Sequence, residues 1–426
     1  MMRRLMFAAA LIGVLAASVF AANIEIWMFG MANEYVKIHQ ELIEQEFTPK
    51  TGIAVNVLAY PSEGFQNKVL LAMVSGDSPD IVTGPVDHIV EYGIRGSILP
   101  LRKVFPEKLA EIEPRLYSGA GMDHQGQGFG VVQYVGGIIG YQRTDILADL
   151  GVEYPTTWAD LYEILPKLKA QGHEVAFGYG GVGSSPQWGA YLLMKQHGGG
   201  FVDTVTYRSL LNDPETIAGF KEFIELYTVH KMPQEITYLT MFRTGELAIF
   251  FDSVTAYASV DKGAPEIAGR WAYGLMPGTP RPDGTIDHQT FMAAQGLAIS
   301  KDSKNKEAAM EFIAWLVSDD IQTRLLTELP RRMPGAMLIP GNKAALEAVP
   351  VRESDRPTLD KQLAVSTPFA YYPGAMSINR YVEFAVHEAL QLGVTPEQAL
   401  YKAHTLTEAD LRQKTIEYER FIKNLL

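Results

Sequence analysis

The segment ANIEIWMFGMANEYVKIHQELIEQEFTPKTGIAVNVLAY, residues 22–60, sets the architecture of the chain. It predicts a strand over 24–27, an amphipathic helix that begins at an Asn33 cap, and a second strand over 53–60. Another helix and a strand over 81–83 follow. Strands separated by helices indicate a parallel sheet, and ligands bind beyond the carboxyl ends of such strands. We therefore expect a binding site near the three strand ends, at residues 27–29, 60–62 and 83–85.

A glycine-rich segment, residues 126–140, leads from this first unit into a second one. It predicts an extended crossing between two lobes, with a hinge near Gln133 and Tyr134. Beyond it, Thr157 and Asp160 are spaced as a capping box at a helix start. The pattern then predicts further elements: strands over 174–179 and 246–251, helices over 188–196 and 214–229, and a helical region that begins with a capping box at 395–398. The second unit is thus another α/β layer.

The N-terminus has the features of an export signal. Arg3 and Arg4 precede an apolar run over 5–20, and the small residues Ala21 and Ala22 follow. We expect cleavage before Ala22 and a soluble, extracytoplasmic mature chain. The alternative is that the run is retained as a membrane anchor, since it is long for a signal.

Composition narrows the class of protein. The 426 residues include no cysteine, which excludes disulfides, thiol catalysis and the lipid-carrying cysteine of an exported lipoprotein. A hydrophobic content of 47% is enough for two domain-sized cores. The formal net charge of -12 becomes about -14 without Arg3 and Arg4, which argues against nucleic acid or an anionic membrane as partner. A neutral ligand fits this charge better.

Several segments occur in an order and spacing that resemble a known family. They are LLAMVSGDSPDIVTG, GSILPLRKVF, YPTTWADLYEILPKLKAQG, FRTGELAIFF, YGLMPGTPRPDG, GLAISKDSKNKEAAMEFIAWLVSDDIQTRLL and GVTPEQAL. The chain resembles extracellular solute-binding proteins of the carbohydrate-importing ABC transporter class, family 1, which are similar to maltose-binding protein. The resemblance covers nearly all of the chain beyond the signal.

This resemblance implies an α/β fold with two lobes, each a mainly parallel sheet flanked by helices, joined by a multi-strand hinge. It implies a signal peptide at 1–21, a first lobe of 22–132 with 291–334, and a second lobe of 133–290 with 335–426. The ligand would be captured between the lobes by hinge closure and delivered to the membrane permease subunits of an ABC transporter. We expect a monomer that binds a sugar, oligosaccharide or polyol and catalyses no reaction.

A sugar presents apolar C–H faces and a rim of hydroxyls, so its site needs aromatic side chains beside polar ones. From their positions near strand ends and the expected cleft, we select eight candidate ligand-binding residues: Trp27, Tyr60, Tyr134, Trp188, Phe251, Asp252, Trp271 and Phe291. Each aromatic residue could instead be part of the core. Asp252 follows an apolar strand, where it would accept hydrogen bonds from hydroxyls or fix a turn or helix cap. No EF-hand pattern is present, and we predict neither a metal nor a cofactor.

Three other charged positions have structural explanations. Asp80, in GDSPDIV, is expected to fix its turn. Arg331 and Arg332 lie where the chain should return across the hinge, and they would hold an anionic ligand or form surface ion pairs. We favour the ion pairs.

Enzyme alternatives rest on weaker patterns. Residues 178–183 form a GxGxxG with Asp203 about twenty residues later, but Ser184, Ser185 and Pro186 interrupt the passage into the helix. A flexible loop at the rim of the cleft is the better explanation of these glycines. The serious alternative is an exported glycoside hydrolase that uses a carboxylate pair, although the 49 acidic residues make chance pairs inevitable. The identity, size and phosphorylation of the ligand are left open by the sequence.

Overall fold

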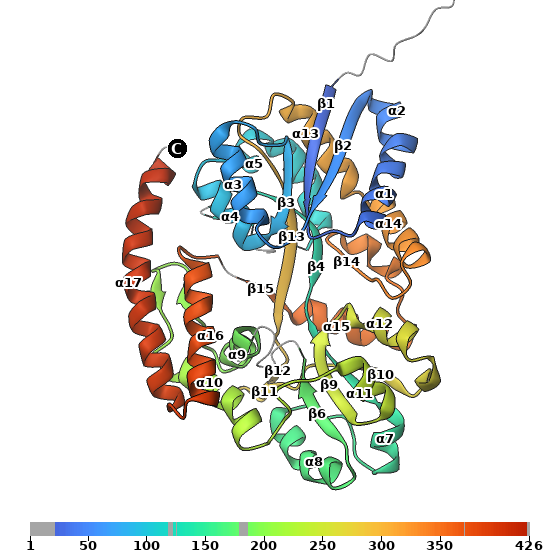
Figure 1. Ribbon diagram of the computed structural model, residues 1–426, viewed down its shortest axis with the longest axis vertical. Helices are drawn as coiled ribbons and strands as arrows, with labels where there is room; N and C mark the ends of the chain where they lie inside the picture. Colours follow the sequence, from blue (N-terminus) through green and yellow to red (C-terminus); the bar gives the residue numbers. More distant parts are fainter. Residues whose placement is uncertain (1–21, 118–121, 125, 179–185, 370, 424–426) are drawn as a thin grey trace, which may run out of the picture.

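The computed structural model describes residues 22–117, 122–124, 126–178, 186–369 and 371–423, and it arranges them in two lobes (Figure 1). Each lobe is built on one sheet. The first lobe has the strand order β14-β4-β13-β3-β1-β2, with β15 paired to β13, and the second has the order β10-β5-β9-β6. Two small hairpins, β7–β8 and β11–β12, complete the strands. The predicted two-lobed α/β fold is confirmed.

The first lobe begins as the sequence predicts. Strand β1 (Ala22–Phe29) pairs in parallel with both β2 (Ile53–Tyr60) and β3 (Ile81–Pro85). Helix α1 starts at Asn33, but Ala32 occupies the cap position and no side chain caps the helix, so the expected Asn33 cap is wrong. The extension of this helix ends at Gly52, whose φ of 72° is a left-handed conformation that glycine adopts easily. The remaining elements are α1 (Asn33–Leu42), η1 (Ile43–Phe47), α2 (Thr48–Thr51), α3 (Phe65–Ser75), α4 (Val86–Ile94), α5 (Leu101–Val104), α6 (Pro106–Ile112), η2 (Glu113–Arg115), β4 (Val131–Gly136), β13 (Phe291–Ile299), α13 (Lys306–Leu316), α14 (Asp319–Arg332), β14 (Ile339–Pro340), η4 (Lys343–Ala348) and β15 (Thr367–Pro368).

The second lobe contains the predicted helix that starts at Thr157. Its side chain accepts a hydrogen bond from the Asp160 backbone N–H, and the Asp160 side chain accepts one from the Thr157 N–H, so the capping box is confirmed. The elements of this lobe are β5 (Ile138–Arg143), α7 (Thr144–Asp149), α8 (Trp158–Ala170), β6 (Glu174–Phe177), α9 (Pro186–Gln196), β7 (Val202–Asp203), β8 (Arg208–Ser209), α10 (Pro214–Thr228), α11 (Tyr238–Thr244), β9 (Leu247–Ser253), α12 (Ala256–Gly263), η3 (Pro265–Ile267), β10 (Trp271–Gly274), β11 (Thr279–Pro280), β12 (Ile286–Asp287), α15 (Arg356–Val365), α16 (Ala375–Gln391) and α17 (Pro396–Lys423).

Both sheets are mixed, which differs from the expected mainly parallel pairing. In the first lobe β13 runs antiparallel to β3 and β4. In the second lobe β5 runs antiparallel to β9 and β10, whereas β6 and β9 are parallel. The antiparallel strands β13 and β5 belong to the crossings between the lobes, so they enter their sheets from the opposite end to the strands that helices connect locally.

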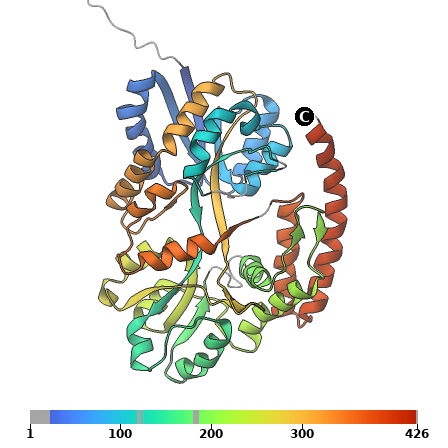
Figure 2. The same cartoon turned by 180° about the vertical axis from the view of Figure 1, so that it is seen from behind.

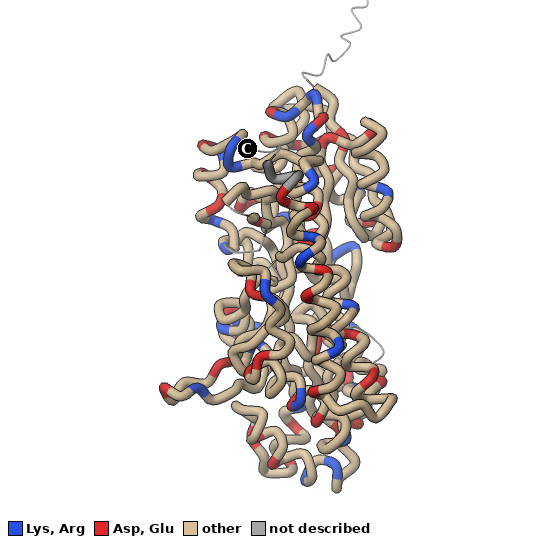
Figure 3. The backbone as a smooth tube through the Cα atoms, turned by 90° about the vertical axis from the view of Figure 1, so that its left-hand side faces the viewer, with Lys and Arg blue, Asp and Glu red and all other residues tan. Residues whose placement is uncertain are grey.

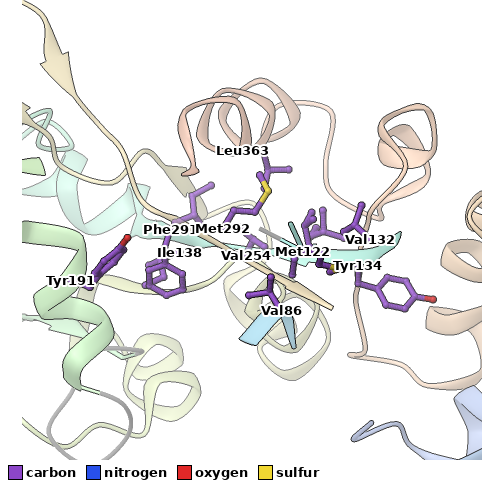
Figure 4. Close-up of a cluster of buried hydrophobic side chains, with 14 of the residues drawn as sticks. Val86, Met122, Val132, Tyr134, Ile138, Tyr191, Val254, Phe291, Met292 and Leu363 are labelled. Carbon is purple, nitrogen blue, oxygen red and sulfur yellow. The ribbon is translucent and has the colours of Figure 1, made fainter. Parts of the chain in front are cut away.

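The chain crosses between the lobes on extended strands (Figure 2). Strand β4 lies in the first sheet and β5 in the second, with Gly137 between them. This passage lies a few residues after the hinge that we predicted at Gln133 and Tyr134, which are both in β4. Buried apolar side chains follow the crossing strands, among them Ile138, Phe291 and Met292 (Figure 4). The predicted lobe boundaries stay a prediction.

Asp80 joins distant segments of the first lobe by side-chain hydrogen bonds, and its expected role in fixing its own turn stays a prediction. Its carboxylate accepts hydrogen bonds from the Glu25 N–H at 2.9 Å, the Ser303 hydroxyl at 2.6 Å and the Asn305 amide at 3.3 Å. Strand β1 is therefore joined to the segment between β13 and α13.

Within the described part of the chain, no helix has both the length and the apolar character needed to cross a membrane.

Candidate functional site

A cavity of about 260 Å³ lies between the lobes, and we call it the aromatic cavity. The first lobe contributes the start of α4 and the start of β13, and the second contributes the start of α9 and of α16. Its lining consists of Pro85, Val86, Asp87, Trp188, Phe291, Ala293, Ala294, Phe369, Tyr371, Tyr372, Ala375 and Asn379. Because elements of both lobes form its walls, a change in the angle between the lobes would change its shape.

Three aromatic rings from distant parts of the sequence form one wall of this cavity. Trp188 lies 5.9 Å from Phe291 and 4.3 Å from Phe369, measured between ring centroids, and Phe291 lies 4.7 Å from Phe369. The structure therefore brings together two of the predicted residues, Trp188 and Phe291. Phe369 was missed, although it follows the two-residue strand β15 and so obeys the same strand-end rule.

Polar groups accompany the aromatic wall. Asp87 comes from the first turn of α4, and Asn379 comes from α16. The Tyr372 hydroxyl donates a hydrogen bond to the Asn379 carbonyl oxygen at 3.3 Å, and burial raises the pKa of this tyrosine. The cavity thus combines an apolar face with a carboxylate and an amide, which together accept and donate hydrogen bonds.

A second cavity of about 350 Å³ also lies between the lobes, and we call it the Asp252 cavity. The segment before α1 and the loop after α14 line it from one side, and the ends of β9 and α12 from the other. The lining residues are Met31, Ala32, Tyr35, Tyr238, Asp252, Ser253, Thr255, Ala256, Ser259, Leu329, Met333, Gly335, Ala336, Met337 and Leu338. The hydroxyl of Tyr35 is buried without a hydrogen-bond partner among the described residues. A ligand that forms a hydrogen bond with this hydroxyl would remove the free-energy cost of leaving it without a partner.

Asp252 is the carboxylate of the Asp252 cavity. Burial raises its pKa to about 6, while a hydrogen bond of 2.6 Å from the Ser253 N–H acts in the opposite direction. The neighbouring Gly178 makes room for it, because a Cβ at that position would lie 2.5 Å from the Asp252 carboxylate. Both of the roles expected for Asp252 are compatible with this geometry: it fixes the local turn and it lines a cavity.

The described lining of both cavities contains no lysine, arginine or histidine. Each cavity has a single carboxylate, Asp87 in one and Asp252 in the other. No group of three or more His, Asp or Glu side chains suited to hold a metal ion occurs among the described residues. The cavities are therefore chemically suited to a neutral ligand that offers hydroxyl groups.

Comparison with known proteins identifies the family. The sequence matches the profile of the bacterial extracellular solute-binding proteins over residues 34–323, which is more than half of the chain. The chain belongs to this family. No curated protein matches this solute-binding protein in sequence.

Solved structures share the fold of this solute-binding protein at low sequence identity. The sugar-binding protein MalE from Xanthomonas citri has a TM-score of 0.79 and 16% identity, over 93% of this chain and 99% of that one. The cyclic alpha-maltosyl-1,6-maltose binding protein from Arthrobacter globiformis has a TM-score of 0.75 and 17% identity, over 92% and 99%. An ABC transporter solute-binding protein from Thermotoga lettingae, bound with alpha-D-tagatose, has a TM-score of 0.72 and 18% identity, over 92% and 100%.

Five predicted ligand-binding residues of this solute-binding protein line neither cavity. Trp27 and Tyr60 pack on each other at 5.0 Å, and the Lys68 ammonium lies over both rings at 4.7 and 4.5 Å. The other three are buried in the core: Tyr134, Phe251 and Trp271. Ligand contact by these five residues stays a prediction.

The core positions have a packing explanation. Phe251 contacts the rings of Trp158 and Phe177 at 5.6 and 5.7 Å, inside the second lobe. Trp271 lies 4.7 Å from Tyr257, and the Arg352 guanidinium stacks over it at 4.1 Å. Phe251 points to the opposite face of β9 from its neighbour Asp252. Trp271 lies on the same face of the sheet as Phe250 and Asp252, because its partner Arg143 is two residues from Tyr141, which pairs with Phe250. Tyr257 and Arg352 cover it there.

Arg331 and Arg332 line neither cavity. Arg332 forms ion pairs with Glu41, Glu34 and Glu328, and Arg331 pairs with Glu328 at 2.9 Å, as expected for surface arginines. The GxGxxG motif at 178–183 lies outside the described residues except for its first glycine.

Proposed function

We propose that this solute-binding protein is the extracytoplasmic component of an ABC importer and captures a sugar, oligosaccharide or polyol between its lobes. The observation that carries the proposal is the wall of three aromatic rings, contributed by Trp188, Phe291 and Phe369, in a cavity that both lobes line. Aromatic faces bind the C–H faces of sugars, and the hinge between the lobes allows the ligand to be enclosed.

The polar groups of the two cavities match the hydroxyl rim of such a ligand. Asp87, Asn379 and Asp252 supply acceptors, and the Asn379 amide also supplies donors. A hydroxyl or carboxylate left without a partner in a closed cleft costs about 1–3 kcal/mol. This cost lets the cleft discriminate between stereoisomers that place one hydroxyl differently.

The charge of the lining supports a neutral ligand over a phosphorylated one. A phosphate group usually needs arginine, lysine or a set of N–H donors, whereas the described lining offers carboxylates. A solved relative is bound with alpha-D-tagatose and another with maltotetraose, which are neutral sugars. A sugar phosphate or a uronic acid should therefore bind much more weakly than the parent sugar.

We propose that the ligand is delivered to the permease unmodified. The protein would be exported through its N-terminal signal, act as a monomer without a lipid anchor, and present its closed form to the permease subunits of the importer. The family is one of solute-binding proteins, so an exported glycoside hydrolase is not favoured. We expect capture of one ligand per protein and no turnover.

The first experiment is a thermal-shift screen against neutral sugars, polyols, sugar phosphates and uronic acids, followed by calorimetry. A ligand at 100 times its dissociation constant should add about 2.7 kcal/mol to the free energy of unfolding. Incubation of each hit with the protein, followed by chromatography, then measures turnover. One-to-one binding of an unmodified neutral sugar would support the proposal, and many turnovers per protein would contradict it.

A matched pair of variants tests the location of the site. Trp188→Ala removes one ring of the aromatic wall and should weaken ligand binding by about 10-fold or more, as loss of a buried aromatic contact does. Tyr60→Ala removes a predicted residue that lines neither cavity and should leave the affinity unchanged. Equal losses in both variants, or a loss only in Tyr60→Ala, would place the site elsewhere.

A further inference from the structure

The C-terminal helical hairpin, α16 with α17, reaches from one lobe to the other (Figure 1). It is anchored on the second lobe: the Ser209 N–H in β8 donates a hydrogen bond to the Glu408 carboxylate at 2.8 Å, and His404 contacts the Ser209 hydroxyl at 3.0 Å. Tyr418 lies ten residues after Glu408 on the same helix. At about 1.5 Å per residue, a helix carries that position about 15 Å along its axis.

At Tyr418, the hairpin contacts an acidic side chain of the first lobe, Glu91. Glu91, on α4, accepts hydrogen bonds from the hydroxyls of Tyr371, at 2.6 Å, and of Tyr418. The two hydroxyls lie 3.3 Å apart, and Arg95 on α4 pairs with the same carboxylate at 2.5 Å. Burial acts to raise the pKa of Glu91, but the two phenols and Arg95 outweigh it and hold the pKa below its ordinary value.

A second contact between the lobes lies beside this one. His124, from the first lobe, faces the ring of Tyr371 edge-on at 6.2 Å and stacks over Tyr207 at 6.3 Å. Tyr207 belongs to the turn between β7 and β8 in the second lobe, and its φ of 51° is unusual for a bulky residue. The hairpin, the β7–β8 turn and the first lobe therefore meet at Tyr371.

This meeting point borders the ligand cleft. Tyr371 and Asp87 line the aromatic cavity, and they also line a smaller cavity of about 160 Å³ together with Glu91, Lys414 and Tyr418. Acidic and basic residues are interspersed along the outer face of the molecule on this side, which Figure 3 shows. The contact thus lies at the end of the cleft, where a change in the angle between the lobes would pull Glu91 away from the two phenols.

We propose that Glu91, Tyr371 and Tyr418 form a latch that holds the two lobes in this arrangement and closes one end of the ligand cleft. The latch acts through the lobe equilibrium, since Tyr418 and Glu91 do not line the aromatic cavity. The contribution of the latch to ligand retention rests on the proposed function. Its effect on the distance between the lobes does not depend on a ligand. Loss of one hydrogen bond to a charged acceptor should shift the equilibrium toward separated lobes by about 10-fold.

The chain contains no cysteine, so a pair of spin labels can be placed without background labelling. Val74→Cys on α3 and Val229→Cys after α10 put one exposed label on each lobe, since these side chains are 87% and 61% exposed. Pulsed electron paramagnetic resonance on the ligand-free protein then measures the distribution of distances between the lobes. Ligand-free measurement keeps this test independent of whether the protein binds a sugar.

Tyr418→Phe and Glu91→Gln should each broaden this distribution toward longer distances without a matching loss of thermal stability. The control is Tyr381→Phe, which removes a hydrogen bond of 2.9 Å to Asp410 within the same hairpin. It should leave the distribution unchanged. An unchanged distribution in Tyr418→Phe, or an equal change in Tyr381→Phe, would overturn the latch.

Discussion

Replacing Asp252 with asparagine should stabilise the protein near neutral pH. Burial at the end of β9 raises the pKa of the Asp252 carboxyl from 3.8 to about 6. Between these two pH values the folded protein keeps the proton that the unfolded chain has lost. The folded state binds more protons there, so the free energy of unfolding falls as pH rises through this window.

The size of the effect follows from the same pKa values. Each pKa unit is worth about 1.36 kcal/mol, so raising the pKa from 3.8 to about 6 costs the folded protein about 3 kcal/mol once the carboxyl is ionised. Asparagine has nearly the same shape and no charge. Its carbonyl oxygen can still accept the hydrogen bond from the Ser253 N–H. Up to about 3 kcal/mol should therefore be recovered well above pH 6, and only about 1 kcal/mol at pH 4.5.

Urea unfolding followed by tryptophan fluorescence, at pH 4.5 and at pH 7.5, measures this difference. The exposed Asp77→Asn serves as the control for loss of a surface carboxylate, and it should show little change at either pH. The reasoning is refuted if Asp252→Asn is no more stable than the wild type at pH 7.5. It is also refuted if the gain is the same at both pH values, because a pH-independent gain would come from packing and not from ionisation.

Two further substitutions compare a partly buried, hydrogen-bonded carboxylate with an exposed arginine. Asp80→Ala removes three hydrogen bonds that join β1 to the segment before α13. It should lower the free energy of unfolding, measured in urea, by about 3 kcal/mol. A loss below about 1 kcal/mol would show that these segments stay joined without the Asp80 side chain. Arg332→Ala removes exposed ion pairs and should shift neither the thermal midpoint nor the ligand affinity by a measurable amount. A large loss of affinity would instead support the discarded role of Arg332 in holding an anionic ligand.

The local patterns of the sequence predict most of the fold. The alternation of strands and helices over residues 22–85 and the capping box of Thr157 and Asp160 depend on neighbours in sequence, and both are confirmed. The direction of the crossing strands was not predictable in this way. Strand β13 pairs with strands more than 150 residues away, and no local signal records which way it runs.

The residues that line the cavities were harder to predict from the sequence than the fold. Phe251 and Asp252 are consecutive at the end of β9, and both were selected as ligand contacts. Side chains alternate across a strand, so only one of two neighbours can face a given cavity. The structure places Asp252 in a cavity and Phe251 in the core. Phe369 and Asn379 were missed because their proximity to Trp188 depends on how the C-terminal segment folds back onto β13 and α9.

The position of β13 in the first sheet determines when during synthesis this sheet can be completed. It lies between β3 and β4, so the sheet has a gap at its centre until residues 291–299 are available. A growing chain that has not yet reached this segment has no complete first lobe, and contacts between such distant residues form slowly. The N-terminal part of the chain therefore stays without a finished core during synthesis. A polypeptide in that state is still unfolded enough to be threaded through a narrow channel, which suits a protein that must leave the cytoplasm before it works.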